Sequence, residues 1–324
     1  MRAPADARVD VDALARRLRD GDLAAAPAVL NLLEARGEAD RERSEALQTA
    51  LSPAALGHEP PGAIIGVTGP PGVGKSSLLS RLATAWRTDD RSVAVLAVDP
   101  SSRRSGGALL GDRARIERDP ADSGLFIRST AAGDRLGGLA PATRAAASVL
   151  AVAFDVVVIE TVGVGQSETD VADLADTVAV VVQPGAGDVL QFLKAGIMEV
   201  PDVLVVTKAD LGRTAQRTRA DLRAALRSLG SRATPVVAVS SAAPPTGVDE
   251  LMAALDAHRA SLDLAARRLD SRRRAALAEV HAELGDRGLR ALGGRRGALA
   301  SLEGLDPMLG AASLARALRE RALS

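Results

Sequence analysis

The sequence contains no cysteine, and only 1% of its residues are aromatic. The absence of cysteine excludes disulfide bonds, thiolate zinc sites and iron–sulfur clusters. Hydrophobic residues make up 47% of the chain, which is enough for a sizeable core. Because aromatic side chains are so scarce, that core must be built from Ala, Leu and Val.

The chain also lacks an excess of either charge, since 41 Lys and Arg residues balance 41 Asp and Glu residues. This balance argues against nucleic acid or a membrane surface as a partner. No run is long and apolar enough to cross a bilayer. The first residues include Asp6 and Asp10 and have no apolar core, which is unlike a signal peptide. We therefore expect a cytoplasmic location, and 324 residues allow one large α/β domain with helical extensions, or two domains.

One short stretch, Gly69 to Ser76, reads G-x-x-x-x-G-K-S. It follows an apolar run typical of a buried strand and precedes a run with helical spacing, which is the context that a phosphate-binding P-loop requires. Glycines let backbone N–H groups close around phosphates, and the helix N-terminus adds partial positive charge. We expect Lys75 to contact the β- and γ-phosphates and the Ser76 hydroxyl to ligate Mg²⁺. The predicted nucleotide-binding segment is Gly69, Pro70, Pro71, Gly72, Val73, Gly74, Lys75, Ser76 and Ser77.

From Ala63 onward, short apolar runs alternate with helical runs, which predicts an α/β fold with a doubly wound, mostly parallel sheet of the P-loop NTPase type. Continuous apolar runs suit strands that are buried on both faces. Ligands of such sheets gather at the carboxyl ends of the strands. The predicted strands are Ile64–Thr68, Val93–Val98, Leu125–Arg128, Val156–Glu160, Val178–Val182, Val203–Thr207 and Val236–Val239. The predicted helices are Lys75–Arg87, Pro141–Ala153, Val189–Glu199, Gln216–Leu229 and Val248–Leu262.

Acidic residues end two of these predicted strands. Glu160 ends the fourth, and Gly163 follows three residues later. A P-loop enzyme needs an acid near Mg²⁺ and a flexible glycine whose N–H can meet the γ-phosphate. Asp99 ends the second strand, and Asp112 lies in a glycine-rich stretch that is a candidate switch. We predict that Asp99 and Asp112 bind metal or position water. A helix N-cap is the alternative for Asp112.

The sixth predicted strand ends in Thr207-Lys208-Ala209-Asp210, which resembles the guanine-reading N-K-x-D. An aspartate there accepts two hydrogen bonds from guanine, whereas adenine has no matching pair of donors. The Lys208 stem can cover the purine face. Ser241 and Ala242, after the last strand, fit the loop whose backbone N–H meets guanine O6. Thr207 replaces the usual Asn, which puts the side-chain amide contacts of that position in doubt.

Helical patterns precede and follow this region, so we expect three parts. Residues 1–57 form an N-terminal helical extension, 58–262 the P-loop GTPase domain, and 263–324 a C-terminal helical dimerisation arm. The arginine-rich run after Leu262 is most simply a solvated helix face, because acidic residues interrupt it. The histidines have no neighbouring ligand types, so His58 is expected at the surface, and His258 and His281 in packing or surface positions.

The chain resembles the MeaB/ArgK family in five segments: VTGPPGVGKSSLL, AVDPSS, GGALLGDR, VVVIETVGVGQSETDVADLADT and VQPGAGDVLQFLKAGIMEVPD. Members of this family are GTPase chaperones of adenosylcobalamin-dependent acyl-CoA mutases, chiefly methylmalonyl-CoA mutase. The resemblance implies a homodimer held largely through the C-terminal arm. It also implies slow GTP hydrolysis that the mutase stimulates, and a nucleotide state that gates adenosylcobalamin delivery and protects or reactivates the mutase.

The resemblance also implies roles for single residues. It assigns Lys75 and Ser76 to phosphate and Mg²⁺, and Asp210 and Ala242 to guanine. Asp99, Asp112 and Glu160 are assigned to the metal and the attacking water, and Gln166 and Lys194 lie in segments that report to the partner. The chain departs from the family pattern at Thr207 and at Met308, where an aromatic residue is common.

Three alternatives stay open at this point. A metal-insertion GTPase for hydrogenase or urease would need Cys or His ligands, and this chain has no Cys and three scattered His. An ATP-using partitioning switch tends to carry a second lysine early in its P-loop, where this chain has Pro70 and Pro71. A structural protein with a vestigial nucleotide site is the third. The sequence does not identify which acyl-CoA mutase would be served.

Overall fold

The computed structural model describes residues 10–35, 37–99, 116, 119, 121–131, 139–161, 167–185, 201–231 and 233–323, with the backbone alone at 99, 131 and 167–169. The chain divides into two compact units. The first, which we call the helical unit, comprises Met1–Gly62, Arg144–Phe154 and Arg268–Ser324. The second, which we call the sheet unit, comprises Ala63–Thr143 and Asp155–Arg267.

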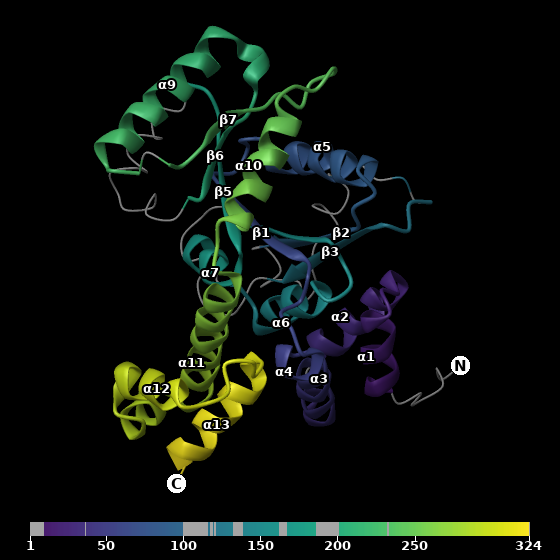
Figure 1. Ribbon diagram of the computed structural model, residues 1–324, viewed down its shortest axis with the longest axis vertical. Helices are drawn as coiled ribbons and strands as arrows, with labels where there is room; N and C mark the ends of the chain where they lie inside the picture. The colour runs from purple at the N-terminus through teal and green to yellow at the C-terminus, as the bar shows by residue number, and fades with distance from the viewer. Residues whose placement is uncertain are drawn as a thin grey trace. The chain divides into compact units, whose positions relative to one another are not determined.

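The sheet unit is built on a seven-stranded sheet with the order β3-β2-β4-β1-β5-β6-β7, and all its strand pairs are parallel (Figure 1). All seven predicted strands are present, with ends shifted by at most a few residues. The order reverses at β1, the central strand, which pairs with β4 on one side and β5 on the other. The strands are β1 (Ala63–Thr68), β2 (Val93–Asp99), β3 (Leu125–Ala131), β4 (Val156–Glu160), β5 (Thr177–Val182), β6 (Val203–Val206) and β7 (Val236–Ala238).

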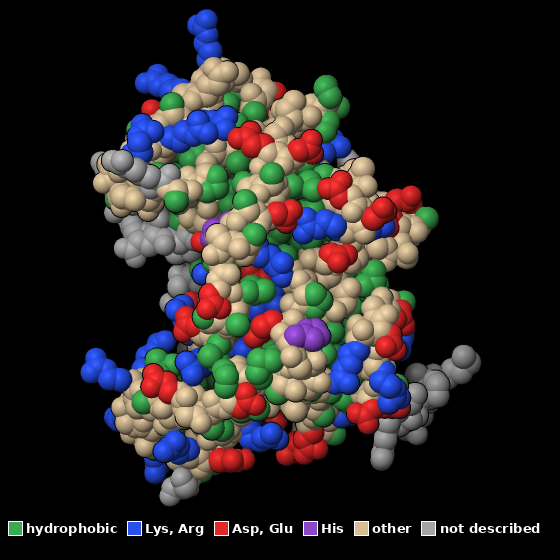
Figure 2. Space-filling model, in the orientation of Figure 1, with side chains coloured by type: hydrophobic (Ala, Val, Ile, Leu, Met, Phe, Trp, Pro, Cys, Tyr) green, Lys and Arg blue, Asp and Glu red, His purple; other side chains and the backbone are tan. Residues whose placement is uncertain are grey.

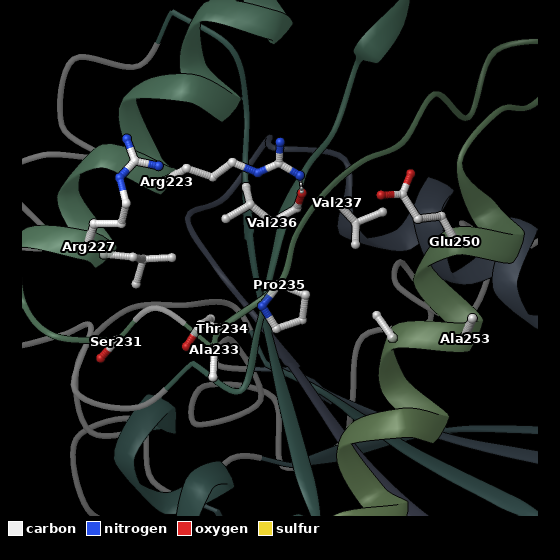
Figure 3. Close-up of a pocket in the computed structure, with 12 residues that line it drawn as sticks. Arg223, Arg227, Ser231, Ala233, Thr234, Pro235, Val236, Val237, Glu250 and Ala253 are labelled. Carbon is white, nitrogen blue, oxygen red and sulfur yellow. Dashed lines mark hydrogen bonds between the residues drawn. The ribbon is translucent and has the colours of Figure 1, made fainter.

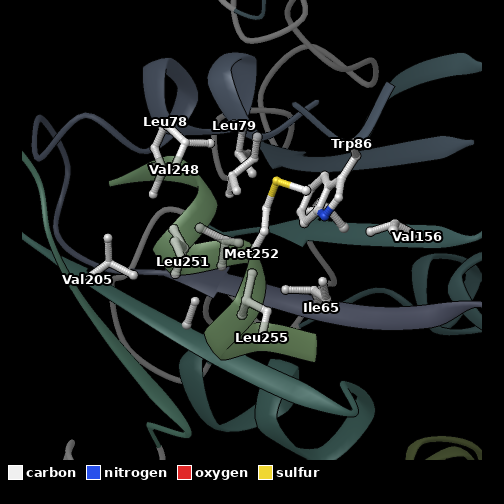
Figure 4. Packing of buried hydrophobic residues seen from close by; sticks show 14 of the residues in the cluster. Ile65, Leu78, Leu79, Trp86, Val156, Val205, Val248, Leu251, Met252 and Leu255 are labelled. Atoms are coloured by element: carbon white, nitrogen blue, oxygen red, sulfur yellow. The ribbon is translucent and has the colours of Figure 1, made fainter. Parts of the chain in front are cut away.

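One face of the sheet packs against α5 (Lys75–Thr88) and α10 (Val248–Ala260). Figure 4 shows Trp86 and Leu79 from α5 meeting Met252 and Leu255 from α10 above Ile65. Apart from Trp86, this core consists mainly of Val, Leu, Ile and Ala, as the composition predicts. The tight packing holds α5 at a constant position relative to β1, and this position fixes the loop between them.

Other helices cover the opposite face. In α7 (Ser167–Leu174), Val171 lies so close to Gly66 of β1 that a Cβ on this glycine would stand 2.7 Å from Val171 Cγ2. The helix α9 (Arg213–Ser228) buries Ala215, Leu222 and Leu226 and exposes most of its charged residues. The predicted helix Val189–Glu199 lies outside the described residues. The predicted helix Pro141–Ala153 corresponds to α6 (Pro141–Leu150).

The helical unit contains the N-terminal helices and the end of the chain. Its first elements are α1 (Val11–Arg19), η1 (Leu23–Ala25), α2 (Ala26–Glu34), α3 (Glu38–Ala50) and α4 (Pro53–Leu56). Its last elements are the part of α11 (Leu264–Ala291) that follows Arg267, then α12 (Gly294–Glu303) and α13 (Ala311–Leu323). The helix α11 is interrupted at Gly285, which has φ 60°. These last helices share an apolar cluster of Leu, Ala and Val side chains.

The arginine run of α11 is not simply a solvated face. Arg268 is only 6% exposed, and its guanidinium donates to the carbonyl oxygens of Pro60 and Gly62 at 2.5 and 2.6 Å. Arg272 pairs with Glu59 at 2.9 Å. The expectation of a solvated face is therefore wrong for these arginines, because the Pro-rich segment before β1 offers backbone acceptors that periodicity cannot reveal. His58 is exposed, as predicted. None of the described helices combines the length and hydropathy that crossing a membrane requires.

Candidate nucleotide-binding site

The loop between β1 and α5 has the backbone geometry of a phosphate-binding loop. Gly69, Gly72 and Gly74 have φ values of 145°, 78° and 97°, which side chains with a Cβ rarely adopt. At Gly69 space is also restricted, because a Cβ would lie 2.1 Å from the carbonyl oxygen of Val181. Gly74 is the N-cap of α5, so the helix begins at Lys75 with its unpaired N–H groups at the end of the loop. The predicted strand–loop–helix context is confirmed.

The Lys75 side chain lies along this loop. Its ammonium group donates to the carbonyl oxygens of Gly69 at 2.6 Å and Pro70 at 3.0 Å, and the residue is 7% exposed. The ammonium group therefore lies at the loop that leads into the N-terminus of α5. Two sources of positive potential therefore converge on the loop, which suits an anion with several phosphate oxygens.

The next residue meets the acid at the end of β4. The Ser76 hydroxyl donates to Glu160 Oε1 at 3.0 Å, and Glu160 is 8% exposed. This contact arises because β4 pairs directly with β1, with Glu160 in register with Val67. Beside it, the Thr161 hydroxyl bonds to the Thr68 hydroxyl at 2.9 Å. The two residues predicted as metal ligands from separate motifs are thus brought together, whereas the threonine pair was not predicted.

The other predicted acidic residues are described only in part. Asp99 ends β2, two positions beyond the residue that pairs with Glu160, so the sheet brings its backbone to the same edge. Its side chain, together with Asp112, Gly163, Gln166 and Lys194, lies outside the described residues. In the described part of the chain, no group of three or more His, Asp or Glu side chains could hold a metal ion.

Thr207 anchors the P-loop to the neighbouring strands. Its buried hydroxyl lies 2.6 Å from the carbonyl oxygen of Val73 and 3.1 Å from that of Val182. The sequence suggested only a lost amide contact at this position. In the structure the threonine has a positive role, since its hydroxyl holds the loop against the ends of β5 and β6. Asn has a longer side chain than Thr. The contacts of the Thr207 hydroxyl therefore could not be inferred from the N-K-x-D motif alone.

The adjacent Lys208 extends back towards the same loop. Its ammonium group donates to Gln183 Oε1 at 2.5 Å and lies 3.5 Å from the carbonyl oxygen of Gly72. Lys208 has φ 52°, a left-handed conformation that turns the chain sharply after β6. Gln183, which follows β5, was not identified from the sequence. Its contact holds the Lys208 ammonium group near the P-loop carbonyl of Gly72.

Ser240 organises the loop that follows β7. Its hydroxyl donates to Asp210 Oδ1 at 2.7 Å, and the N–H of Ala242 donates to the same hydroxyl at 3.2 Å. Arg81 of α5 also holds the loop, through a 3.0 Å bond from Nε to the carbonyl oxygen of Ser241. Asp210, Ser241 and Ala242 are therefore adjacent, as predicted. Ser240 was missed, although it immediately follows the last apolar strand.

These contacts form a site along the carboxyl ends of the parallel strands. One end carries glycines, Lys75 and the Ser76–Glu160 pair, which match a triphosphate and its Mg²⁺. The donor set fits Mg²⁺, because a hydroxyl and a carboxylate are hard oxygen ligands and the ion usually completes its shell with phosphate oxygens and water. The other end carries an exposed carboxylate, suited to a base with adjacent donors. The fold and site define a P-loop nucleotide-binding protein.

Comparison with known proteins identifies the family. The chain belongs to the MeaB family, since the model described as methylmalonyl Co-A mutase-associated GTPase MeaB matches residues 26–291. The chain is therefore a GTPase that binds guanine nucleotides.

Individual relatives agree with this assignment. A protein of Pyrococcus abyssi that is named as a GTPase is 41% identical over 272 residues, which cover 82% of this chain and 81% of the relative. A GTPase of Caulobacter vibrioides is 40% identical over 287 residues, which cover 86% and 87%. A Caenorhabditis elegans protein named methylmalonic aciduria type A homolog, mitochondrial, is 40% identical over 218 residues, which cover 64% of this chain and 54% of that protein.

A solved structure supports the fold independently. The crystal structure of a protein named LAO/AO transport system kinase superposes with a TM-score of 0.65 and 24% sequence identity, covering 99% of this chain and 100% of that one. At this identity the similarity shows the fold alone. It agrees with the doubly wound, parallel P-loop NTPase architecture predicted from the alternating strand and helix patterns.

Proposed function

We propose that this GTPase is a chaperone of an adenosylcobalamin-dependent acyl-CoA mutase, with methylmalonyl-CoA mutase as the first candidate. GTP hydrolysis would gate the loading of adenosylcobalamin and protect or reactivate the mutase. The observation that carries the proposal is the P-loop with its Ser76–Glu160 contact, in a chain that matches the MeaB family over residues 26–291. The name of the Caenorhabditis elegans relative supports a role in methylmalonyl metabolism.

At the phosphate end of the site, each residue has a proposed role. The backbone N–H groups of the non-proline residues from Gly69 to Ser77 and the Lys75 ammonium bind the β- and γ-phosphates. Ser76 and Glu160 would hold Mg²⁺, with Asp99 and Asp112 as further residues for the metal or the attacking water. When bound, Mg²⁺ neutralises charge on the phosphates. Gly163 would bring its N–H to the γ-phosphate.

At the other end, the proposed roles concern the base. Asp210 accepts hydrogen bonds from the N1–H and 2-amino groups of guanine, and Ser240 holds one of its oxygens in place. The Lys208 stem covers the purine face, and Thr207 keeps the P-loop in register with this end. The backbone N–H of the loop of Ser241 and Ala242 would contact guanine O6. Since adenine has no matching pair of donors for Asp210, GTP is favoured over ATP.

Hydrolysis in such a site depends on positioning and charge neutralisation. A water molecule attacks the γ-phosphate in line with the leaving oxygen. No glutamine directly follows Gly163, so the usual residue for orienting that water is missing from the expected position. We therefore propose slow turnover by the chain alone, and faster turnover when the mutase reshapes the segments around Gln166 and Lys194.

We also propose a homodimer formed through the C-terminal arm, residues 263–324. Its helices α12 and α13 and the C-terminal part of α11 share one apolar cluster within the helical unit. The GTPase domain, residues 58–262, would then contact the mutase.

The decisive experiment is a pull-down of purified methylmalonyl-, ethylmalonyl- and isobutyryl-CoA mutases with the full-length chain, loaded with GTP, a non-hydrolysable GTP analogue or GDP. We expect one mutase to bind in a nucleotide-dependent manner and to stimulate GTP hydrolysis. Equal binding in all nucleotide states, or no stimulation by any of them, would rule out the chaperone role. Lys75→Ala should abolish GTP binding and serves as the control for nucleotide dependence.

A further inference from the structure

Within the part of the chain that the structure describes, the last strand of the sheet has a neighbouring strand on one side only. There β7 pairs with β6 alone, in the register Leu204↔Val236. The N–H of Leu204 donates to the carbonyl oxygen of Pro235, so the carbonyl of Val236, the next residue, faces the opposite edge. An unpaired strand edge carries backbone groups that can bind another extended chain.

A groove of about 590 Å³ lies along this edge. Its floor is Thr234 to Val237, and Figure 3 shows α9 on one side and α10 on the other. Further along the strand the edge is covered, because Gly247 approaches the carbonyl oxygen of Ala238 so closely that a Cβ there would lie 2.1 Å from it. The groove thus occupies the place of a short eighth strand.

The two walls of the groove differ in charge. Arg223 and Arg227 of α9 line one wall, while the α10 wall carries Glu250 and the small side chains of Ala253 and Ala254. The sequence of α9 contains five arginines and one aspartate, in a chain with formal net charge zero. The space-filling view shows basic side chains gathered over this helix (Figure 2).

The arginines on the α9 wall are only partly neutralised. Arg219 is paired with Glu250 at 2.7 Å and also donates to the carbonyl oxygen of Val236 at 2.8 Å. Arg223 donates to the same carbonyl at 3.3 Å, which is a long contact. Among the described residues, Arg227 forms no ion pair. Arg223 and Arg227 are four residues apart on one helix, a spacing at which like charges repel each other.

We propose that this groove binds an extended acidic segment of a partner polypeptide, which adds to β7 as an eighth strand and places carboxylates against Arg223 and Arg227. Charge complementarity selects this occupant, because the basic wall stands directly beside the outer edge of β7. The segment would present acidic side chains to α9 and small or apolar side chains, on alternate positions, to Ala253 and Ala254.

Binding would exchange weak contacts for stronger ones. The guanidinium of Arg223 would leave its long bond to the neutral carbonyl of Val236 and form a charge-assisted bond to a carboxylate. In place of Arg223, a backbone N–H of the added strand would donate to the Val236 carbonyl oxygen, which keeps its 2.8 Å bond from Arg219. Arg227, which forms no ion pair within the described residues, would gain one, and the repulsion between the two arginines would fall. The groove is separate from the GTP site, so the inference does not depend on the proposed chaperone role.

A peptide titration tests the proposal with the full-length chain. The probe is a fluorescent, acetylated octapeptide of alternating Glu and Val. Its binding is measured by fluorescence anisotropy at low ionic strength. Two matched peptides separate charge from strand pairing. In one, Gln replaces each Glu, and in the other, alternate backbone amides are N-methylated. We expect each change to weaken binding at least about tenfold, since each removes one of the two required contacts.

Variants of the protein locate the site. Arg223→Glu and Arg227→Glu should each weaken binding of the Glu–Val peptide at least about tenfold, whereas Arg217→Glu, the same change on the same helix outside the groove, should not. GTP turnover should be unaffected in all three. The proposal would be overturned if the parent protein did not bind the Glu–Val peptide measurably. It would also be overturned if the parent bound the N-methylated peptide as tightly as the Glu–Val peptide, or if Arg223→Glu and Arg227→Glu both bound the Glu–Val peptide as tightly as the parent. Competition by inorganic phosphate with no effect of N-methylation would reveal an anion site only, and would equally overturn strand addition.

Discussion

The hydroxyl of Ser76 donates a 3.0 Å hydrogen bond to Glu160 Oε1, although the two residues are 84 positions apart in the chain. The P-loop places the serine at the start of α5, and the pairing of β1 with β4 brings the glutamate beside it. Neither residue alone distinguishes an enzyme from a phosphate-binding turn. Together they form the oxygen-rich end of the proposed site for GTP and Mg²⁺.

This pair gives the first prediction. Glu160→Gln and Ser76→Ala should each lower the GTP turnover about 100-fold, because each removes an oxygen ligand or a negative charge from the phosphate end of the site. Steady-state phosphate release over a Mg²⁺ titration measures both the rate and the metal dependence. The control is Glu303→Gln, the same change at an exposed residue of α12 in the helical unit. Turnover of Glu160→Gln at the parental rate would refute the assignment.

Thr207 gives the second prediction. Thr207→Val removes the hydroxyl that lies 2.6 Å from the Val73 carbonyl but keeps the shape of the side chain. We expect the free energy of unfolding to fall by about 1–3 kcal/mol, because buried polar groups lose their partner. The affinity for GTP should fall as well, since the P-loop loses an anchor. Urea denaturation and nucleotide titration check both effects.

Thr207→Ser is the matched variant, because it retains the hydroxyl and should retain most of the affinity for GTP. A Thr207→Val protein with the stability and GTP affinity of the parent would show that the contact has no energetic role. Trp86, the single tryptophan of the chain, is 1% exposed in the core of the sheet unit. Its fluorescence therefore reports directly on unfolding of the unit that contains this contact.

Base selectivity gives the third prediction. Xanthine carries a carbonyl oxygen where guanine has its 2-amino group, so an amide at position 210 can accept from N1–H and donate to that oxygen. Asp210→Asn should lower the affinity for GTP about 100-fold and raise that for XTP. Competition between labelled GTP and unlabelled XTP measures the switch. An unchanged preference for GTP would mean that Asp210 does not contact the base.

The helical unit gives the fourth prediction, which concerns pH. Arg319 of α13 contacts Glu279 and Glu283 of α11 and Glu45 of α3, at 3.4, 3.0 and 3.3 Å. Burial raises the pKa of Glu279 from 4.5 to about 7, while Arg319 opposes the shift. Between these two pH values the folded state keeps a proton that the unfolded state has lost. The free energy of unfolding should therefore fall as the pH rises from about 4.5 to about 7.

Glu279→Gln removes this titration. The variant should be more stable than the parent at pH 8, and its free energy of unfolding should vary less between pH 5 and pH 8. Urea denaturation followed by circular dichroism at several pH values checks this. Glu303→Gln, at an exposed position of the same unit, should keep the pH dependence of the parent. If Glu279→Gln also keeps that dependence, Glu279 is not the titrating group.

Much of the site was accessible from the sequence because its motifs are local. The P-loop requires glycines, a lysine and a serine at fixed spacing within one short stretch, and the structure confirms its strand–loop–helix context. Strands buried on both faces are read from continuous apolar runs, which explains why all seven were found. Their ends were less accurate, since the end of a strand depends on hydrogen bonds to its neighbours rather than on its own residues.

Contacts between distant segments could not be predicted in this way. Ser240 belongs to no motif in the sequence, yet its hydroxyl bonds to Asp210, 30 positions earlier in the chain. From the sequence, Thr207 is only a replacement of the usual asparagine, although its hydroxyl donates to the carbonyl oxygen of Val73. Arg268 reads as a solvated charge but binds two backbone carbonyls that precede β1 by only a few residues. In each case the partner is chosen by the strand order and the helix packing.

The amino-acid sequence by itself predicted the class of fold, because strand and helix patterns alternate along the chain. It also predicted the phosphate-binding loop and the preference for guanine, because each of these depends on the chemistry of a few neighbouring residues. Only the tertiary structure decided which side chains meet across the carboxyl edge of the sheet, and that a basic groove runs beside the unpaired edge of β7. The physical reason is that a hydrogen bond or an ion pair needs two groups within about 3 Å of each other. For groups far apart along the chain, that distance is set by the packing of the whole unit.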